Sequence, residues 1–136
     1  MDDLLKTLRI SGAGLKAQGT RLRVISENIA NADSLGTKPG ELPYRRQTVV
    51  FKNELEKSTG TDTVRVHKID RDMSEFGKRF DPQHPSADAD GYVLLPNVNR
   101  LLEMMDMKEA QRSYEANLSS VRSAKSMLQG TIDILR

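Results

Sequence analysis

The fold is decided by residues 97–136, NVNRLLEMMDMKEAQRSYEANLSSVRSAKSMLQGTIDILR. Apolar residues recur every seven positions along this stretch and form the seam of a long amphipathic helix: Met107, Tyr114, Val121, Leu128 and Leu135. One side of this seam is flanked by Met104, Leu118 and Ile132, and the other side by Ala110, Asn117, Ala124 and Thr131. We expect the helix to begin after Pro96, with Asn97 or Asn99 as its cap, and to reach the last residue, Arg136, which suits the negative end of the helix dipole.

A second heptad pattern runs through residues 4–32 near the N-terminus. Its main positions are Leu8, Leu15, Leu22 and Ile29, with Leu4, Ser11, Gln18, Ile25 and Ala32 offset from them. Asp2 and Asp3 favour a helix start, and Gly36 with residues 39–40, Pro-Gly, supplies a stop. Three glycines inside the pattern, at positions 12, 14 and 19, each cost about 1 kcal/mol relative to Ala. The first helix is therefore expected to be weak in isolation.

The two predicted helices can pair as an antiparallel coiled coil, but one such contact leaves the broad apolar flanks partly in water. We therefore expect loose arms in the free chain that become ordered on self-association. The predicted assembly seam consists of Leu8, Leu15, Leu22, Ile25, Ile29, Met107, Tyr114, Asn117, Leu118, Val121, Leu128, Ile132 and Leu135. Asn117 has two possible roles on this seam: a register-setting hydrogen bond, or rotation to a solvated flank.

The middle of the chain has a residue pattern that differs from the two heptad regions. Residues 48–51, 63–66 and 91–95 alternate β-branched or aromatic residues and predict short strands. Between them, residues 70–90 carry two prolines and two large apolar residues, Phe76 and Phe80, so an extended loop is expected there. The predicted fold is mainly α with a small β insert, divided into an N-terminal helix and turn (1–36), a β-rich and loop segment (37–96) and a C-terminal helix (97–136).

Composition narrows the class of protein. The 136 residues, with a net charge of +2, allow one compact domain or a small core with long arms, and the charge surplus is too small for a dedicated nucleic-acid binder. Leu, Ile, Val and Phe make up 32 of the 136 residues, which predicts a small aliphatic core. The absence of Cys excludes disulfides, thiolate metal sites and Cys nucleophiles. No secretory signal peptide or membrane span is evident, so we expect a soluble chain made in the cytoplasm.

Residues 12–17, GAGLKA, match the glycine fingerprint of dinucleotide-binding folds, with Asp33 near the place of the ribose-binding acid. That motif requires a buried strand before it, whereas the helical heptad continues through these glycines, so no cofactor site is expected. The basic residues Lys16, Arg21 and Arg23 could contact phosphates, but nearby acidic residues favour a solvated helix face.

Possible metal ligands occur in the middle segment. Ser86, Asp88, Asp90 and Gly91 fit the first positions of a calcium-binding loop, but Asn97 stands where the bidentate Glu is needed, which favours a solvated turn. His84 lies near Asp81 and Asp88, yet a single His between two prolines is more often a loop residue, and His67 is distant along the chain. No nucleophile motif and no paired histidines occur, so we expect neither catalysis, a metal nor a cofactor.

Residues 28–36, NIANADSLG, resemble the N-terminal signature of bacterial flagellar axial proteins, which include rod, hook and hook-associated subunits. The motif residues are Asn28, Ile29, Ala30, Asn31, Ser34 and Gly36. The resemblance narrows to the basal-body rod proteins through residues 43–46 (PYRR), 81–85 (DPQHP), 87–92 (ADADGY), 96–99 (PNVN), 103–107 (EMMDM) and 112–117 (RSYEAN). It covers nearly the whole chain. Ser34 stands where axial proteins often have Thr and keeps a hydroxyl for a local turn bond, and Glu75 stands where Pro is common.

The resemblance implies a structural subunit of the proximal rod, the drive shaft that links the membrane-embedded rotor to the hook across the periplasm, without any reaction. It implies assembly with further copies and with rod subunits of the FlgB, FlgF and FliE types. It also implies passage through the flagellar type III export apparatus without a cleaved signal peptide, and neither nucleic-acid binding nor membrane insertion. The seam would then build the inner tube, the turn at residues 28–36 would fix the exit from the first helix, and the middle segment would pack outward. The alternatives are another flagellar axial protein, a soluble coiled-coil adaptor, and a metal- or nucleotide-dependent enzyme.

Overall fold

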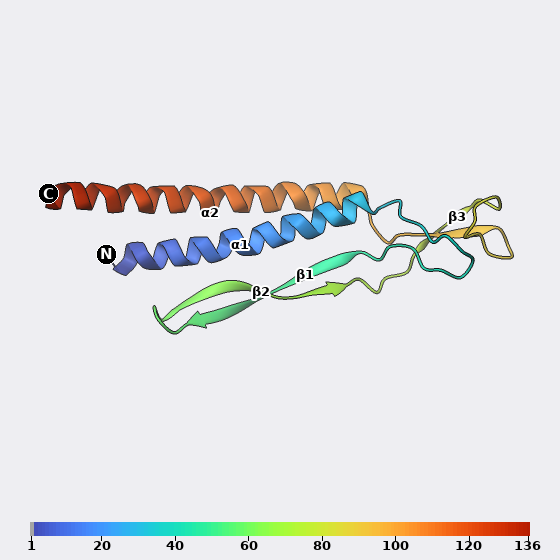
Figure 1. Ribbon diagram of the computed structural model, residues 1–136, viewed down its shortest axis with the longest axis horizontal. Coiled ribbons are helices and arrows are strands. Elements are labelled where there is room, and N and C mark those ends of the chain that lie inside the picture. Colours follow the sequence, from blue (N-terminus) through green and yellow to red (C-terminus); the bar gives the residue numbers. More distant parts are fainter. Residues whose placement is uncertain (1) are drawn as a thin grey trace. The chain divides into compact units, whose positions relative to one another are not determined.

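The computed structural model describes residues 2–136, which form two long helices and four strands (Figure 1). In chain order the elements are α1 (Asp2–Ala30), β1 (Gln47–Glu56), β2 (Thr61–Arg71), β3 (Gly77–Phe80), β4 (Tyr92–Leu95) and α2 (Arg100–Leu135). β1 pairs with β2 and β3 pairs with β4, giving two separate two-stranded sheets. The predicted class, mainly helical with a small β insert, is confirmed.

The chain divides into two compact units, each of which draws on both helices and on the middle of the chain. Unit 1 comprises the chain up to Leu22, Val49–Lys68 and Lys108–Arg136. Unit 2 comprises Arg23–Thr48 and Ile69–Met107. Each unit has its own set of side-chain contacts.

The first helix is continuous through its glycines, as the heptad pattern predicts, and the two acidic residues at positions 2 and 3 lie in its first turn. It ends at Ala30, two residues before the periodic pattern ends. The chain turns there because Asn31 donates its side-chain amide to the carbonyl of Glu27 at 2.9 Å, and the amide of Ser34 donates to the carbonyl of Asn31 at 3.0 Å. These bonds offer the backbone an alternative to another helical turn.

The second helix is capped by Asn99, one of the two predicted cap residues. The Asn99 side-chain oxygen accepts hydrogen bonds from the amides of Leu101 (3.1 Å) and Leu102 (3.4 Å), while its carbonyl accepts the amide of Glu103 (3.0 Å). These contacts satisfy amide groups that have no partner inside the first turn of a helix. Asn97, the other predicted cap, has a different role in unit 2.

Within unit 1 the two helices run antiparallel and approach closely. A Cβ atom placed on Gly14 would lie 2.6 Å from Nδ2 of Asn117, so a side chain at this position would force the Asn117 side chain to move. The guanidinium of Arg21 lies 3.7 Å from the carboxylate of Glu109. Residues later in α1 therefore lie beside residues earlier in α2, as expected for antiparallel helices. The buried residues of this unit are small: Ser11, Gly14, Ala17, Ala110 and Ala124.

The hairpin of β1 and β2 contains the predicted strands 48–51 and 63–66, and both strands are longer than the prediction. Its turn is closed by the Glu56 carbonyl, which accepts the amides of Thr59 (3.2 Å) and Gly60 (2.8 Å), and Gly60 has a φ of +67°. Within unit 1, Arg9 of α1 reaches this hairpin through an ion pair with Glu56 at 3.0 Å.

The prediction of an extended loop over residues 70–90 is wrong in part, because β2 continues to Arg71 and residues 77–80 form β3. β3 pairs antiparallel with β4, with Phe80 opposite Tyr92, and the two rings meet edge to face with centroids 5.4 Å apart. Gly91 precedes β4 with a φ of +85°, and a Cβ atom there would lie 2.9 Å from the Phe80 ring. The strand GKRF has no β-branched residue, so its pairing depends on a partner twelve or more residues away that local patterning does not reveal.

Candidate functional site

The most connected residue of unit 2 is Asn28, which is 1% exposed near the end of α1. Its side-chain oxygen accepts the Tyr44 hydroxyl at 2.7 Å and the Gln47 amide at 2.9 Å, and its amide nitrogen donates to the Gln47 carbonyl at 2.9 Å. The same nitrogen lies 3.4 Å from a carboxylate oxygen of Glu103 on α2. Asn28 thereby bonds both backbone groups of the first β1 residue.

A buried carboxylate lies beside this amide. Glu103 is 2% exposed, and the Nε of Arg46 donates to its Oε1. The same guanidinium donates to a carboxylate oxygen of Asp72 at 3.3 Å, so one cation is shared by two acidic residues. A buried charge is costly without a partner, so Arg46 and Glu103 depend on each other.

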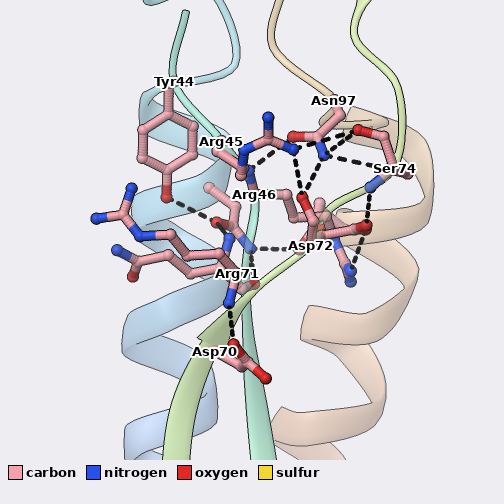
Figure 2. A network of polar contacts seen from close by, with 11 residues as sticks. Tyr44, Arg45, Arg46, Asp70, Arg71, Asp72, Ser74 and Asn97 are labelled. Carbon is pink, nitrogen blue, oxygen red and sulfur yellow. Dashed lines mark hydrogen bonds and ion pairs between the residues drawn. The ribbon is translucent and has the colours of Figure 1, made fainter. Parts of the chain in front are cut away.

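Asn97 joins the two strands at the open end of the hairpin (Figure 2). Its side-chain oxygen accepts the amide of Arg46 at 2.7 Å, while its nitrogen donates to the carbonyl of Asp72 at 2.8 Å and to the hydroxyl of Ser74 at 3.1 Å. The Asp72 amide in turn donates to the Arg46 carbonyl at 2.9 Å. We call Asn28, Tyr44, Arg46, Asp72, Asn97 and Glu103 the junction network.

Arg45 extends the network toward Phe76, one of the predicted loop anchors. Its guanidinium donates to the carbonyl of Asp72 at 3.0 Å and lies 4.3 Å from the centre of the Phe76 ring. A cation over an aromatic face is attracted by the ring quadrupole. Phe76 is therefore held as an anchor, whereas Phe80 pairs with β4.

The surroundings shift the pKa values of three network members. Hydrogen bonds from the Ser74 amide and hydroxyl, with a smaller contribution from Arg46, lower the pKa of Asp72. Burial, followed by the negative charges of Glu27 and Glu103, raises the pKa of Tyr44. Burial alone would lower the pKa of Arg46, but its hydrogen bonds to Glu103 and Asp72 outweigh burial and raise that pKa. These pKa shifts favour the charged forms of Asp72 and Arg46 and the neutral form of the Tyr44 phenol.

The axial-protein motif occupies the exit from α1. Asn28 and Gly36 are buried, Ile29 and Asn31 are half-buried, and Ala30 and Ser34 are exposed. The Ser34 hydroxyl donates to the side-chain oxygen of Asn31 at 3.0 Å, which is the local turn bond expected of that hydroxyl. A Cβ atom on Gly36 would lie 2.6 Å from the carbonyl oxygen of Glu41, so a side chain there would displace the loop.

The predicted seam residues are mostly not buried within the chain. Ile25 is buried, Ile132 and Leu135 are exposed, and ten are half-buried: Leu8, Leu15, Leu22, Ile29, Met107, Tyr114, Asn117, Leu118, Val121 and Leu128. In unit 1, the α2 face turned toward α1 is the small flank of Ala110, Asn117 and Ala124. The large aliphatic residues of the seam therefore keep surface available.

Apolar exposure is concentrated on α2. Of the sixteen large hydrophobic residues that are exposed among residues 2–136, eight belong to this helix: Leu101, Leu102, Met104, Met105, Met127, Ile132, Ile134 and Leu135. Exposed apolar patches of this kind mark interaction surfaces. No helix within residues 2–136 is both long and apolar enough to cross a bilayer.

The other candidate residues have structural surroundings. Residues 12–17 lie in the middle of α1. The Asp88 carboxylate accepts the amides of Asp90 and Tyr92, both at 2.9 Å, and the Ser86 hydroxyl lies 2.7 Å from Nδ1 of His84. His67 is exposed on β2. Within residues 2–136, no three acidic or His residues are grouped so as to hold a metal ion.

Sequence models of two protein families match this chain. The family described as "Flagella basal body rod protein" matches residues 8–37, and the family described as "Flagellar basal body rod FlgEFG protein C-terminal" matches residues 89–134. The first match covers most of α1 with its exit turn, and the second covers β4 and nearly all of α2. Both family models describe flagellar basal-body rod proteins, so the two matches assign the chain to the class of flagellar rod proteins.

Curated relatives narrow the class further. "Flagellar basal-body rod protein FlgC" of Agrobacterium fabrum is 49% identical over 136 residues, covering 100% of this chain and 98% of the relative. The proteins of the same name from Borreliella burgdorferi and Salmonella typhimurium are 39% and 38% identical and cover 98% and 96% of this chain and 98% and 97% of their own lengths. The chain belongs to the FlgC family of flagellar basal-body rod proteins, which are structural proteins and not enzymes.

Sequence reasoning missed the junction network, although five of its six members, all except Asp72, lie in the stretches that resemble the rod proteins. Asn28, Tyr44, Arg46, Asn97 and Glu103 are separated by up to 75 positions, and no local pattern indicates that they meet. One feature of the sequence could have indicated that Glu103 is special. Glu103 interrupts an otherwise apolar run, residues 101–105, and on the helix it lies on the side opposite to its neighbours.

Proposed function

We propose that this chain is a structural subunit of the proximal rod, which assembles through its terminal helices with copies of itself and with other rod subunits into a shaft that transmits torque. Membership of the FlgC family and the arrangement of the apolar surface support this function. No reaction is involved.

The observation that carries the proposal is the imbalance between buried and exposed apolar residues. Among residues 2–136 six apolar residues are fully buried, three of them Ala: Ala17, Val24, Ile25, Val93, Ala110 and Ala124. Sixteen large apolar side chains remain exposed. Since burial of apolar surface is the dominant favourable term in folding and association, neighbouring subunits have to supply the missing cover.

In this proposal the segments have different tasks. The N-terminal segment (1–36) and the C-terminal segment (97–136) pair as an antiparallel coiled coil, and their seam residues, from Leu8 to Ile29 and from Met107 to Leu135, build the wall of the tube. The middle segment (37–96) packs outward. The motif around Asn28 fixes the exit from α1, which the hydrogen bonds of the junction network support.

Membership of the family supports the partners and the location that we propose. The partners are rod subunits of the FlgB, FlgF and FliE types and the flagellar type III export apparatus, and the chain reaches the periplasmic rod without a cleaved signal peptide. A small core and a glycine-containing α1 support this route, because a chain that unfolds at low cost passes through a channel more easily.

The test replaces Leu128 and Ile132 by Asp in the full-length chain. Two carboxylates on this apolar face oppose assembly through desolvation, so we expect normal cellular levels of the chain but no rod incorporation and no swimming. The control is Ser119→Asp with Ser126→Asp, because both serines are exposed on the opposite face of α2. Swimming cells of the first variant, with the subunit present in isolated basal bodies, would contradict the proposal.

A further inference from the structure

Most methionine side chains of this protein are exposed to solvent. Methionine is ordinarily one of the residue types that proteins bury. Four of the five methionines within residues 2–136 are instead more than half exposed: Met73 (77%), Met104 (52%), Met105 (60%) and Met127 (61%). The fifth, Met107, is half-buried. Since the sequence has no Cys, these thioethers are the sulfur groups that the free chain offers to reactive solutes.

Two of the exposed methionines, Met104 and Met105, belong to a continuous apolar cluster at the start of α2. Leu101 lies three positions before Met104 and four before Met105, and Leu102 lies three positions before Met105. Residues at these spacings are neighbours on the surface of a helix. Leu101 and Leu102 are also more than half exposed. We call these four residues the methionine surface.

The orientation of the methionine surface is fixed by the buried residue between its members, Glu103. The carboxylate of Glu103 accepts a hydrogen bond from Nε of Arg46 and lies 3.4 Å from the side-chain nitrogen of Asn28. Successive helical residues point about 100° apart, so Met105 lies roughly opposite Glu103. A rotation of this turn that buried the thioethers would separate the Glu103 carboxylate from its partners, which is costly for a buried charge. Met104 and Met105 therefore stay exposed in the free chain.

The other two exposed methionines lie outside such a cluster. Met73 stands between two polar residues, Asp72 and Ser74, in the segment that joins β2 to β3. Met127 has only small helix neighbours at spacings of three and four: Ser123, Ala124, Gly130 and Thr131. Met73 and Met127 thus match the first pair in exposure but not in surroundings.

We propose that Met104 and Met105 form a modification site, at which hydrogen peroxide converts the thioethers to sulfoxides and thereby blocks assembly; this proposal rests on the proposed function. The sulfur attacks one oxygen of the peroxide, so that an S–O bond forms while the O–O bond breaks. The sulfur is oxidised by two electrons. The second oxygen leaves as hydroxide, which takes the proton of the transferred hydroxyl and becomes water. Each peroxide consumed gives one methionine sulfoxide and one water.

Oxidation changes the chemical character of the methionine surface. A thioether is apolar, whereas a sulfoxide is polar and accepts hydrogen bonds. In the proposed rod, the exposed apolar side chains of α2 leave water against neighbouring subunits, and burial of an acceptor without a donor is unfavourable. A methionine sulfoxide reductase, with a dithiol as the reductant, restores the thioether and releases water, so the block is reversible.

Mass spectrometry of the purified full-length chain after mild hydrogen peroxide treatment tests the site itself. We expect Met104 and Met105 each to gain one oxygen atom about as fast as Met73 and Met127. All four should react at least about fivefold faster than the half-buried Met107, because oxidation follows exposure. The proposal is overturned if Met104 and Met105 react no faster than Met107.

Incorporation of the chain into basal bodies tests the consequence, in cells that lack methionine sulfoxide reductases. Met104→Gln with Met105→Gln places polar groups on the methionine surface, and should lower the amount of the chain in isolated basal bodies about tenfold at an unchanged cellular level. Met104→Leu with Met105→Leu conserves volume but cannot be oxidised, so this variant should still be incorporated during a peroxide pulse that stops incorporation of the parent chain. The matched control, Met73→Leu with Met127→Leu, should be stopped like the parent.

Normal incorporation of the Gln variant, or equal losses of the two Leu variants under peroxide, would overturn the proposal. These outcomes are distinct from failure of the rod function. A parent chain that is missing from untreated basal bodies would contradict the rod function. A parent chain that is present there, and is stopped by peroxide no more than the variant without Met104 and Met105, would contradict the modification site alone.

Discussion

The side chain of Asn28 makes the hydrogen bonds to the first residue of β1 that a neighbouring strand would otherwise make. Its side chain bonds both the amide and the carbonyl of Gln47 and also accepts the hydroxyl of Tyr44. An amide side chain has the donors and acceptors needed for all three bonds, whereas Asp lacks the donor and Leu lacks both. The chain can leave α1, form a loop and begin the hairpin without an unpaired polar group at this point.

We expect Asn28→Ala to lower the free energy of unfolding by about 3 kcal/mol, because the variant leaves buried partners without hydrogen bonds. Urea denaturation followed by circular dichroism measures this change. The control, Asn31→Ala, removes the side-chain bonds to the Glu27 carbonyl and from the Ser34 hydroxyl at a half-buried position and should cost about 1 kcal/mol. Equal costs for the two variants would show that the junction network is not a special source of stability.

Through the protonation of Asp72, the stability that the junction network provides depends on pH. Its folded pKa lies below the ordinary value of 3.8, so the folded state binds fewer protons than the unfolded state in that range. The stabilising contribution of Asp72 is therefore fully present above about pH 4 and is lost as the pH falls through the lower, folded pKa.

The variant Asp72→Asn tests this contribution. Between about pH 4 and pH 2, its free energy of unfolding should fall less steeply with decreasing pH than that of the parent chain. Urea midpoints measured across this range check the slope. Asp62→Asn, at an exposed position of β2, serves as the control and should keep the slope of the parent chain. A parent-like slope in Asp72→Asn would mean that other carboxylates govern acid unfolding.

At the scale of the element, the glycines of α1 have opposite roles. A Cβ atom added at Gly12 or Gly19 would meet nothing within 4 Å, whereas Gly14 faces the Asn117 side chain. We expect Gly12→Ala to stabilise the chain by up to about 1 kcal/mol through helix propensity. Gly14→Ala should destabilise it by about 1–3 kcal/mol through overpacking. Thermal unfolding of the two variants measures both effects.

A double-mutant cycle tests whether Asn117 causes the difference. Asn117→Ala in the Gly14→Ala background should recover much of the lost stability, because the clashing atoms are removed. Additive losses in the double variant would show that the cost of Gly14→Ala arises elsewhere. Asn117 in this structure acts through steric fit against Gly14, which a heptad position alone does not predict.

How well the elements could be predicted depends on whether their signals are local. The helices have strong heptads and a capping Asn, and the two long strands have β-branched alternation, so these elements were predicted. β3 was missed because its four residues gain their stability from Tyr92 and its neighbours across the sheet. The junction network was missed for the same reason, since its hydrogen bonds join residues from Asn28 to Glu103.

The packing of the two helices illustrates a further limit. The largest apolar residues suggested the seam, but in unit 1 the helices approach each other at Gly14 and Asn117, and the buried residues of both helices, among them Ala17, Ala110 and Ala124, are small. Small residues allow the two helices to approach each other closely, while the large aliphatic side chains extend beyond this contact. A heptad pattern gives the period of a helix and does not state which of two adjacent stripes faces the same chain and which faces a neighbour.

At the scale of the whole molecule, we expect the free chain to be cut by trypsin first near the ends of the helices. Arg122 and Lys125 lie in the C-terminal half of α2, whereas Arg46 is held by the junction network. Local opening is easier where few apolar contacts are buried. Mass spectrometry of early fragments from a dilute sample gives the order of cutting. Helix ends as resistant as the network would contradict loose arms.

The small core affects how the stability of the chain and of its assembly depends on temperature. Exposure of apolar surface produces most of the heat-capacity change on unfolding, so a chain that buries six apolar residues fully should show a small change when it unfolds alone. The larger heat-capacity change would accompany joining of the subunits instead, where the exposed aliphatic side chains leave water. Cooling weakens such burial, so the joints between subunits would loosen in the cold before the individual chains unfold.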